Sequence, residues 1–140
     1  MGTMIAGGIC AAQGFRAAGL HVGVKTHNVN KKDVALIVSD VPCAAAGMFT
    51  KNVVKAAPVR VTMEHLADGR ARAVIANSGN ANACAPQGEE NARRMCAAAA
   101  KAIGCGPEEV LVASTGVIGQ TLKVDVIEAG VPELAGLLAR

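Results

Sequence analysis

Aromatic side chains are almost absent from this chain of 140 residues, which has no tryptophan, no tyrosine and two phenylalanines, Phe15 and Phe49. Proteins that bind single-stranded nucleic acid stack the bases on aromatic rings, so this composition argues against that class. Hydrophobic residues still make up 51% of the chain, and small aliphatic side chains, which bury little area each, must fill the interior. We expect a single domain over residues 1–140 that gains stability from contact with a larger partner.

A dense charge of either sign is also missing. The chain has 14 basic and 11 acidic residues, for a formal net charge of +3, and its adjacent basic pairs, Lys31-Lys32 and Arg93-Arg94, are isolated from each other. Because no basic stripe is present to follow a phosphate backbone, we expect no nucleic-acid partner. No apolar run reaches the length that crosses a bilayer, so we expect no membrane partner.

The cysteines and histidines lack the spacings that hold metals or form a disulfide framework. The cysteines make no C-x-x-C pair, and the histidines stand far apart in the sequence. These residues are Cys10, Cys43, Cys84, Cys96 and Cys105, with His21, His27 and His65. An odd number of cysteines without a secretory leader is typical of a reducing compartment. We therefore predict a cytoplasmic protein without a metal ion.

Short apolar runs predict the strands of a sheet. Unbroken runs at 34–38, 73–76 and 110–113 are typical of buried strands, and a further strand is predicted at 43–49. An extended stretch is predicted at 59–61, after a proline.

Helical signals alternate with these strands. The surest helix spans 88–103, with acidic residues in its first turn and Gly104 as its stop. A short helix is predicted from Thr62, as its cap, to Leu66, and two helical pieces at 124–129 and 132–138 are divided by Gly130. Together these elements predict an α/β fold of layered sheets flanked by helices.

The residues Ser114, Thr115 and Gly116 follow the predicted strand at 110–113 and indicate a turn at its end. Thr115 carries a hydroxyl donor, and Gly116 offers a backbone N–H that no side chain shields, so the two can point donors at one developing negative charge. This is the composition of an oxyanion hole. Because Ser-Thr-Gly is also ordinary turn chemistry, these residues alone favour a structural turn.

A second polar stretch, at 77–84, follows the predicted strand at 73–76. It holds Asn77, Asn80 and Asn82, whose side chains hydrogen-bond readily to nearby backbone. Asparagine is a poor nucleophile and a poor proton carrier. Its role is therefore positional, either bracing the loop, which local chemistry favours, or offering amides to a polar ligand.

Six segments, read in order, carry a family resemblance. They are Q-G-F-R-A-A-G at 13–19, A-L-I-V-S-D at 35–40, A-A-G-M-F-T at 45–50, V-K-A-A-P-V at 54–59, N-S-G-N-A-N-A-C at 77–84 and S-T-G-V-I-G at 114–119. Over nearly its whole length the chain resembles the N-terminal part of the bifunctional ornithine acetyltransferase (glutamate N-acetyltransferase) family of arginine biosynthesis. The last two segments are the specific ones.

The resemblance implies an acyltransferase made as one precursor that cuts itself before a threonine. That threonine becomes the terminal nucleophile of a second, C-terminal chain. The family moves an acetyl group from N-acetylornithine to glutamate through an acetyl-threonine intermediate, without a metal or an organic cofactor, and whether acetyl-CoA also serves as a donor is left open. Its oxyanion pair falls here on Thr115 and Gly116, and the segment 77–84 is expected to be scaffold beside the site.

The resemblance also implies that the site is shared with another chain. This chain stops at Arg140, before the family's substrate-contacting threonine and lysine and before its self-cleavage threonine. We therefore expect a truncated N-terminal (alpha) chain, with the C-terminal (beta) chain of the same precursor as its partner, in a heterotetramer of two copies of each.

Two other interpretations stay open from the sequence. One is a self-processing aminopeptidase or amidase that shares the terminal-nucleophile logic. The other is an inactive fragment that folds only in the company of a partner. The two enzyme classes are separated by comparing acetyl transfer from acetylornithine to glutamate with the hydrolysis of peptide amides.

Overall fold

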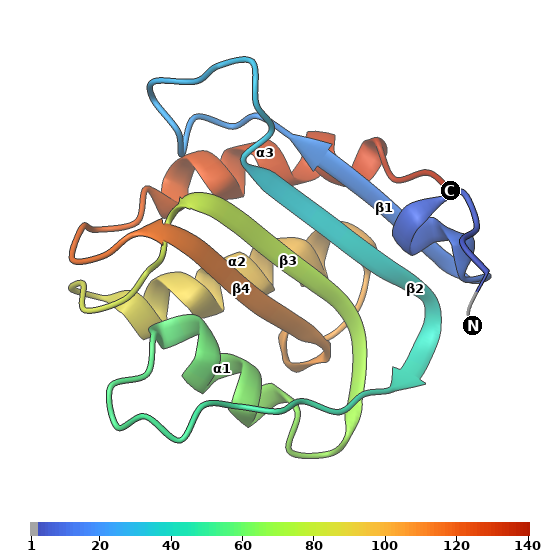
Figure 1. Ribbon diagram of the computed structural model, residues 1–140, viewed down its shortest axis with the longest axis horizontal. Helices are drawn as coiled ribbons and strands as arrows, with labels where there is room; N and C mark the ends of the chain where they lie inside the picture. The colour runs from blue at the N-terminus through green and yellow to red at the C-terminus, as the bar shows by residue number, and fades with distance from the viewer. Residues whose placement is uncertain (1–2) are drawn as a thin grey trace.

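The structure is a computed structural model that describes residues 3–140 (Figure 1). Its central element is a four-stranded sheet. The strands lie in the sheet in chain order, β1 (Phe15–Leu20), β2 (Val34–Ala44), β3 (Arg70–Asn80) and β4 (Val110–Val117). The β1–β2 and β2–β3 pairs are antiparallel, whereas β3 and β4 are parallel. A parallel pair needs a crossover connection, and the helix α2 (Gly88–Ile103) provides it.

The predicted strands at 34–38, 73–76 and 110–113 are confirmed, and each is the apolar centre of a longer strand. The predicted strand at 43–49 is wrong. Its first two residues end β2, and the chain then leaves the sheet. The β2–β3 register is irregular between Val38 and Cys43. Because Pro42 within this stretch has no N–H for the ladder, regular pairing weakens here before the strand ends.

Helix α1 (Ala57–His65) replaces the predicted extended stretch at 59–61 and begins earlier than the predicted cap at Thr62. Proline in the first turn suits a helix start, which explains why Pro58 opens a helix here. The Thr62 hydroxyl instead donates to the Val112 carbonyl (2.7 Å) and accepts the Val112 N–H (3.0 Å). Helix α1 therefore covers the outer edge of β4 and satisfies backbone groups that would otherwise be unpaired there.

Helix α2 has the predicted bounds, and Gly104 ends it in a left-handed conformation. Helix α3 (Val124–Gly136) is continuous, so the predicted break at Gly130 is wrong. A Cβ at Gly130 would lie 2.3 Å from a Val22 methyl, and the glycine thus lets the helix pack closely against the chain after β1. Buried side chains on one stripe of α3 override its low local propensity. They are Val124, Ile127, Val131 and Leu134.

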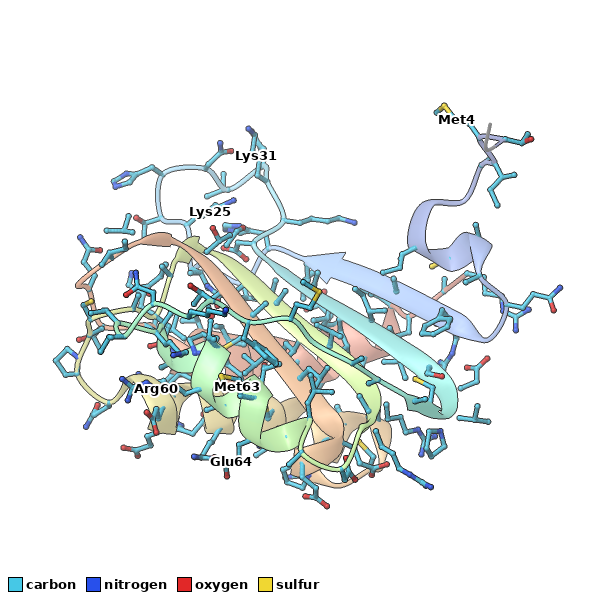
Figure 2. All side chains as sticks on the ribbon, turned by 60° about the horizontal axis from the view of Figure 1, so that its bottom comes forward. Met4, Lys25, Lys31, Arg60, Met63 and Glu64 are labelled. Carbon is cyan, nitrogen blue, oxygen red and sulfur yellow. The ribbon has the colours of Figure 1, made fainter. Side chains whose placement is uncertain are left out.

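The helices form one layer on one face of the sheet, with α2 and α3 behind the strands in Figure 1. The core lies between the two layers and is built from Leu36, Ile75, Met95 and Ile127, among other residues. On the outer side of α1, Arg60 and Glu64 form ion pairs with Glu89 and Arg93 of α2 (Figure 2). Two short 3-10 turns, η1 (Gly8–Ala11) and η2 (Pro107–Glu109), complete the described elements.

The opposite face of the sheet, in front in Figure 1, has no layer of helices within residues 3–140. The side chains across its centre are apolar and mostly half-buried. Two rows cross it, one of Gly19, Ala35, Ala76 and Ala113 and one of Ala17, Ile37, Val74 and Leu111. None of the helices in this part of the chain is both long and apolar enough to cross a membrane.

Candidate functional site

The candidate oxyanion residues lie in a strand, because β4 does not stop at 113 as the sequence predicts. It continues to Val117, with Thr115 paired to Ser78 and Gly116 paired to Gly79 of β3. The predicted turn at 114–116 is therefore wrong, and bends occur instead at 118–120. Both strands end together at this edge of the sheet.

Gly116 has a backbone conformation that requires glycine. Its φ is +135°, and a Cβ on it would lie 2.3 Å from the Gly79 carbonyl carbon and 2.5 Å from the Asn80 nitrogen. Gly79 also has a positive φ, of +104°. Because two glycines face each other, the backbones of β3 and β4 approach more closely than side chains would permit. The position of the Gly116 N–H is thus set by the backbone of β3.

The Thr115 side chain lies on the face of the sheet that the helices leave uncovered. Val110 and Val112 are buried toward the helices, and Thr115, an odd number of residues along the strand from Val112, is exposed. Its partner Ser78 alternates in the same way with the buried Asn77. The hydroxyls of Thr115 and Ser78 therefore project from neighbouring strands on the uncovered face.

The asparagines of segment 77–84 are buried and brace the ends of the strands, as their local chemistry predicts. Asn77 Nδ2 donates to the Asn80 carbonyl (2.9 Å), and Asn82 Nδ2 donates to the Gly88 carbonyl (2.8 Å). Asn80 Nδ2 donates to the carbonyls of Gln120 and Thr121. Residues 77–80 belong to β3, so the loop itself is shorter than the sequence predicts.

The connection from β3 to α2 stores backbone strain. Asn82, Cys84 and Gln87 all have positive φ values, of 48°, 51° and 56°. This conformation is unfavourable for residues other than glycine, and it persists where the surrounding contacts enforce it. The Asn82 bonds described above and the hydrogen bond from Ala57 N–H to the Asn82 carbonyl (3.3 Å) supply that enforcement.

Sequence reasoning missed a buried carboxylate beside the site. Asp33, just before β2, accepts the N–H of Val22 (2.7 Å) and of Lys25 (2.9 Å). Burial acts to raise the pKa of Asp33, but these two hydrogen bonds and the nearby His21 outweigh it and hold that pKa below its usual value. The signal in the sequence was an acidic residue directly before an apolar run.

Asp33 fixes the backbone from which Lys25 reaches the site. The Lys25 side chain lies over Gly79, with its Cγ 2.7 Å from where a Cβ would stand. Figure 2 shows Lys25 at the end of β3. Lys25, Gly79, Val117 and Gln120 share the lining of one surface pocket. Among residues 3–140, no three histidine, cysteine or acidic side chains gather closely enough to hold a metal ion.

The arrangement can stabilise negative charge. A threonine hydroxyl and an unshielded glycine N–H lie in adjacent positions on a strand end whose backbone is immobilised by its neighbour. Donors that are fixed before the reaction and aimed at a developing oxyanion are the usual means of lowering the barrier to acyl transfer.

Comparison with known proteins identifies relatives over almost the whole chain. The family model described as "ArgJ family" matches residues 16–139. Arginine biosynthesis bifunctional protein ArgJ from Symbiobacterium thermophilum is 51% identical over 136 residues, which are 96% of this chain and 34% of that protein. This chain thus spans about a third of the length of the curated relatives it matches.

Solved structures agree with the sequence match. Ornithine acetyltransferase from Mycobacterium tuberculosis, complexed with ornithine, superposes with a TM-score of 0.85 at 43% identity, covering 92% of this chain and 69% of that one. Arginine biosynthesis bifunctional protein ArgJ from Bacillus halodurans superposes with a TM-score of 0.81 at 43% identity, covering 88% of this chain and 64% of that one. The mixed α/β class predicted from the sequence is confirmed, with one sheet rather than several within residues 3–140.

Proposed function

Because the chain belongs to the ArgJ family, we propose that it is the N-terminal part of an acyltransferase that moves an acetyl group from N-acetylornithine to glutamate. In this proposal a threonine at the start of the C-terminal chain is the nucleophile, and the present chain supplies the oxyanion hole. No metal or organic cofactor takes part. Acetyl-CoA is a candidate second acetyl donor.

The reaction runs through two tetrahedral intermediates. The threonine hydroxyl attacks the acetyl carbonyl, its proton passes to the terminal amine, and the ornithine amine leaves with a proton. The glutamate amine then attacks the acetyl-threonine ester, and the threonine hydroxyl is released. In each step the carbonyl oxygen becomes an oxyanion, which accepts hydrogen bonds from the Thr115 hydroxyl and the Gly116 N–H.

The observation that carries the proposal is the geometry of Gly116. The backbone contact with Gly79 and Asn80 leaves no space for a side chain. Gly116 thus offers a backbone N–H with no Cβ beside it, at a strand end that the backbone of β3 holds in place, and a fixed and unshielded donor is what an oxyanion hole requires. The family membership supports the proposed reaction, and this geometry supports the proposed role of Gly116.

The uncovered face of the sheet supports the partnership with a C-terminal chain. Thr115 and Ser78 stand on it beside the two apolar rows described above. In the segment between β2 and α1, Met48 and Val53 are 101% and 88% exposed. An apolar sheet face without a helical layer is typical of a contact surface. In this proposal residues 1–140 form a single domain, and the C-terminal chain packs on its uncovered face and brings its threonine to Thr115. Two copies of each chain form a cytoplasmic heterotetramer.

The test replaces Thr115 in the full-length protein and measures acetyl transfer from acetylornithine to glutamate. Thr115→Val keeps the shape of the side chain but removes the hydroxyl, and we expect kcat to fall by about two to three orders of magnitude. Thr115→Ser keeps the hydroxyl and is the matched control, with kcat within about tenfold of the parent. Unchanged turnover in Thr115→Val would remove Thr115 from the site.

The same preparations distinguish the competing enzyme class. The parent protein is assayed with peptide amides beside acetylornithine plus glutamate. Hydrolysis of the amides without acetyl transfer would favour a self-processing aminopeptidase or amidase over the acyltransferase.

A further inference from the structure

We propose that Asn80 is a positioning residue for the oxyanion hole. Its side chain connects β3 to the segment that follows β4 and so holds Thr115 and Gly116 in place. This inference rests on the proposed function. It assigns Asn80 a role in the rate of acetyl transfer that neither contact with the substrate nor general support of the fold would give it.

Asn80 stands at the point where the two strands end. The register becomes irregular there, and Asn80 pairs with both Thr115 and Val117, the residues on either side of Gly116. The next residue, Ala81, donates its N–H to the Val117 carbonyl (2.9 Å). The end of β3 is therefore paired with the residues of β4 directly before and directly after Gly116.

The Asn80 carboxamide uses both of its ends. Nδ2 donates to the carbonyl of Gln120 (3.0 Å) and to that of Thr121 (3.3 Å), while Oδ1 accepts the N–H of Asn82 (2.7 Å). Asn80 as a whole is 7% exposed. It thus joins the segment after β4 to the segment after β3 across about forty residues of sequence, and it needs a donor and an acceptor at the same time.

These contacts control the oxyanion donors because the space around Gly116 is already filled by Gly79 and Asn80. If the bonds to Gln120 and Thr121 are lost, the segment after β4 is held only by backbone bonds, such as that from the Gly119 N–H to the Ala83 carbonyl (2.9 Å), and the end of β4 can shift against β3. A displacement of about 1 Å at a reacting centre costs on the order of a hundredfold in rate. Asn80 therefore acts by fixing the position of the oxyanion donors. Its replacement lowers kcat rather than the affinity for substrate.

Asn80→Asp in the full-length, processed enzyme tests this role with a pH profile. The carboxyl group keeps the size and the acceptor of the amide, but when ionised it faces two carbonyl oxygens that it repels. When protonated it can donate to one of them. We expect the ratio of variant to parent kcat to fall at least tenfold between pH 6 and pH 8.5, with KM for glutamate within about threefold of the parent.

Asn91→Asp is the matched control. Asn91 is also buried, at 3% exposure, but its Nδ2 makes no hydrogen bond within residues 3–140. Its variant also buries a carboxylate, and we expect the kcat ratio to stay flat with pH. A flat ratio in Asn80→Asp, or a slope of equal size in both variants, would overturn the role of Asn80.

Asn80→Ser keeps the test decisive if Asn80→Asp does not yield processed enzyme. Serine is neutral and too short to reach both carbonyls, and we expect kcat about tenfold below the parent at all pH values, with KM nearly unchanged. A kcat equal to that of the parent would refute the proposal. An inactive parent would instead count against the proposed function, so the two failures are distinguishable.

Discussion

Gly116→Ala is the change that most directly examines why the site is built at this place. The added Cβ would stand 2.3 Å from the Gly79 carbonyl carbon and 2.7 Å from its oxygen. Ordinary van der Waals contact begins at 3.4 Å, so the ends of β3 and β4 must separate by about 1 Å to admit it. The N–H of residue 116 is kept in this variant, but it moves with the strand.

The magnitude follows from that displacement. A misplacement of about 1 Å costs about a hundredfold in rate, which corresponds to ~2.7 kcal/mol of activation free energy. Alanine at a φ of +135° adds backbone strain of about 1–3 kcal/mol to the folded state. We therefore expect kcat for acetyl transfer to fall about a hundredfold or more, with a lower melting temperature.

Gly119→Ala separates the two effects. Gly119 also has a positive φ, of +81°, but a Cβ there meets no atom within 4 Å. The control variant therefore carries backbone strain without displacing a strand, and we expect a lower melting temperature with kcat within about threefold of the parent. Steady-state kinetics and thermal melts of both variants provide the comparison. If Gly116→Ala also keeps kcat within threefold, the Gly116 N–H is not an oxyanion donor.

Two further predictions concern stability. Thr62→Val removes the hydroxyl that bonds both the N–H and the carbonyl of Val112, and we expect a loss of about 1–3 kcal/mol in the free energy of unfolding; urea titration checks it, and Thr62→Ser should restore most of the loss. Because the pKa of Asp33 is lowered in the folded state, its contribution to stability is present above the unfolded pKa, near 3.9, and is lost as the pH falls through the folded value. Melting temperatures between pH 6 and pH 2 should therefore decline less steeply in Asp33→Asn than in the parent, and parallel curves would contradict this.

The sequence determined the parts of the fold that local chemistry controls. Helix 88–103 has its acidic first turn and its small apolar face within 16 consecutive residues, and its glycine stop follows directly, so its bounds were predicted from local signals. The strand centres are apolar runs of a few residues that need no knowledge of their neighbours. The segments at 114–119 and 77–84 likewise indicated the family, and the first of them contained the two oxyanion candidates.

Tertiary structure decided where these elements end and what they do together. Thr62 was predicted to cap a helix, but its hydroxyl bonds Val112, fifty residues away. The break predicted at Gly130 does not occur, because buried contacts with the sheet keep α3 continuous. In both places a distant contact outweighs the local preference, and no window of sequence contains that contact.

The site shows the same division. Thr115 and Gly116 were predicted from their own chemistry and from the resemblance, but as a turn. They lie in a strand because β3 extends as far as Asn80 and pairs with them there. The reason that glycine is needed at 116, and the reason that Asn80 reaches Gln120 and Thr121, are distances between segments about forty residues apart. Such distances are fixed by how the sheet assembles, and the sequence alone does not contain them.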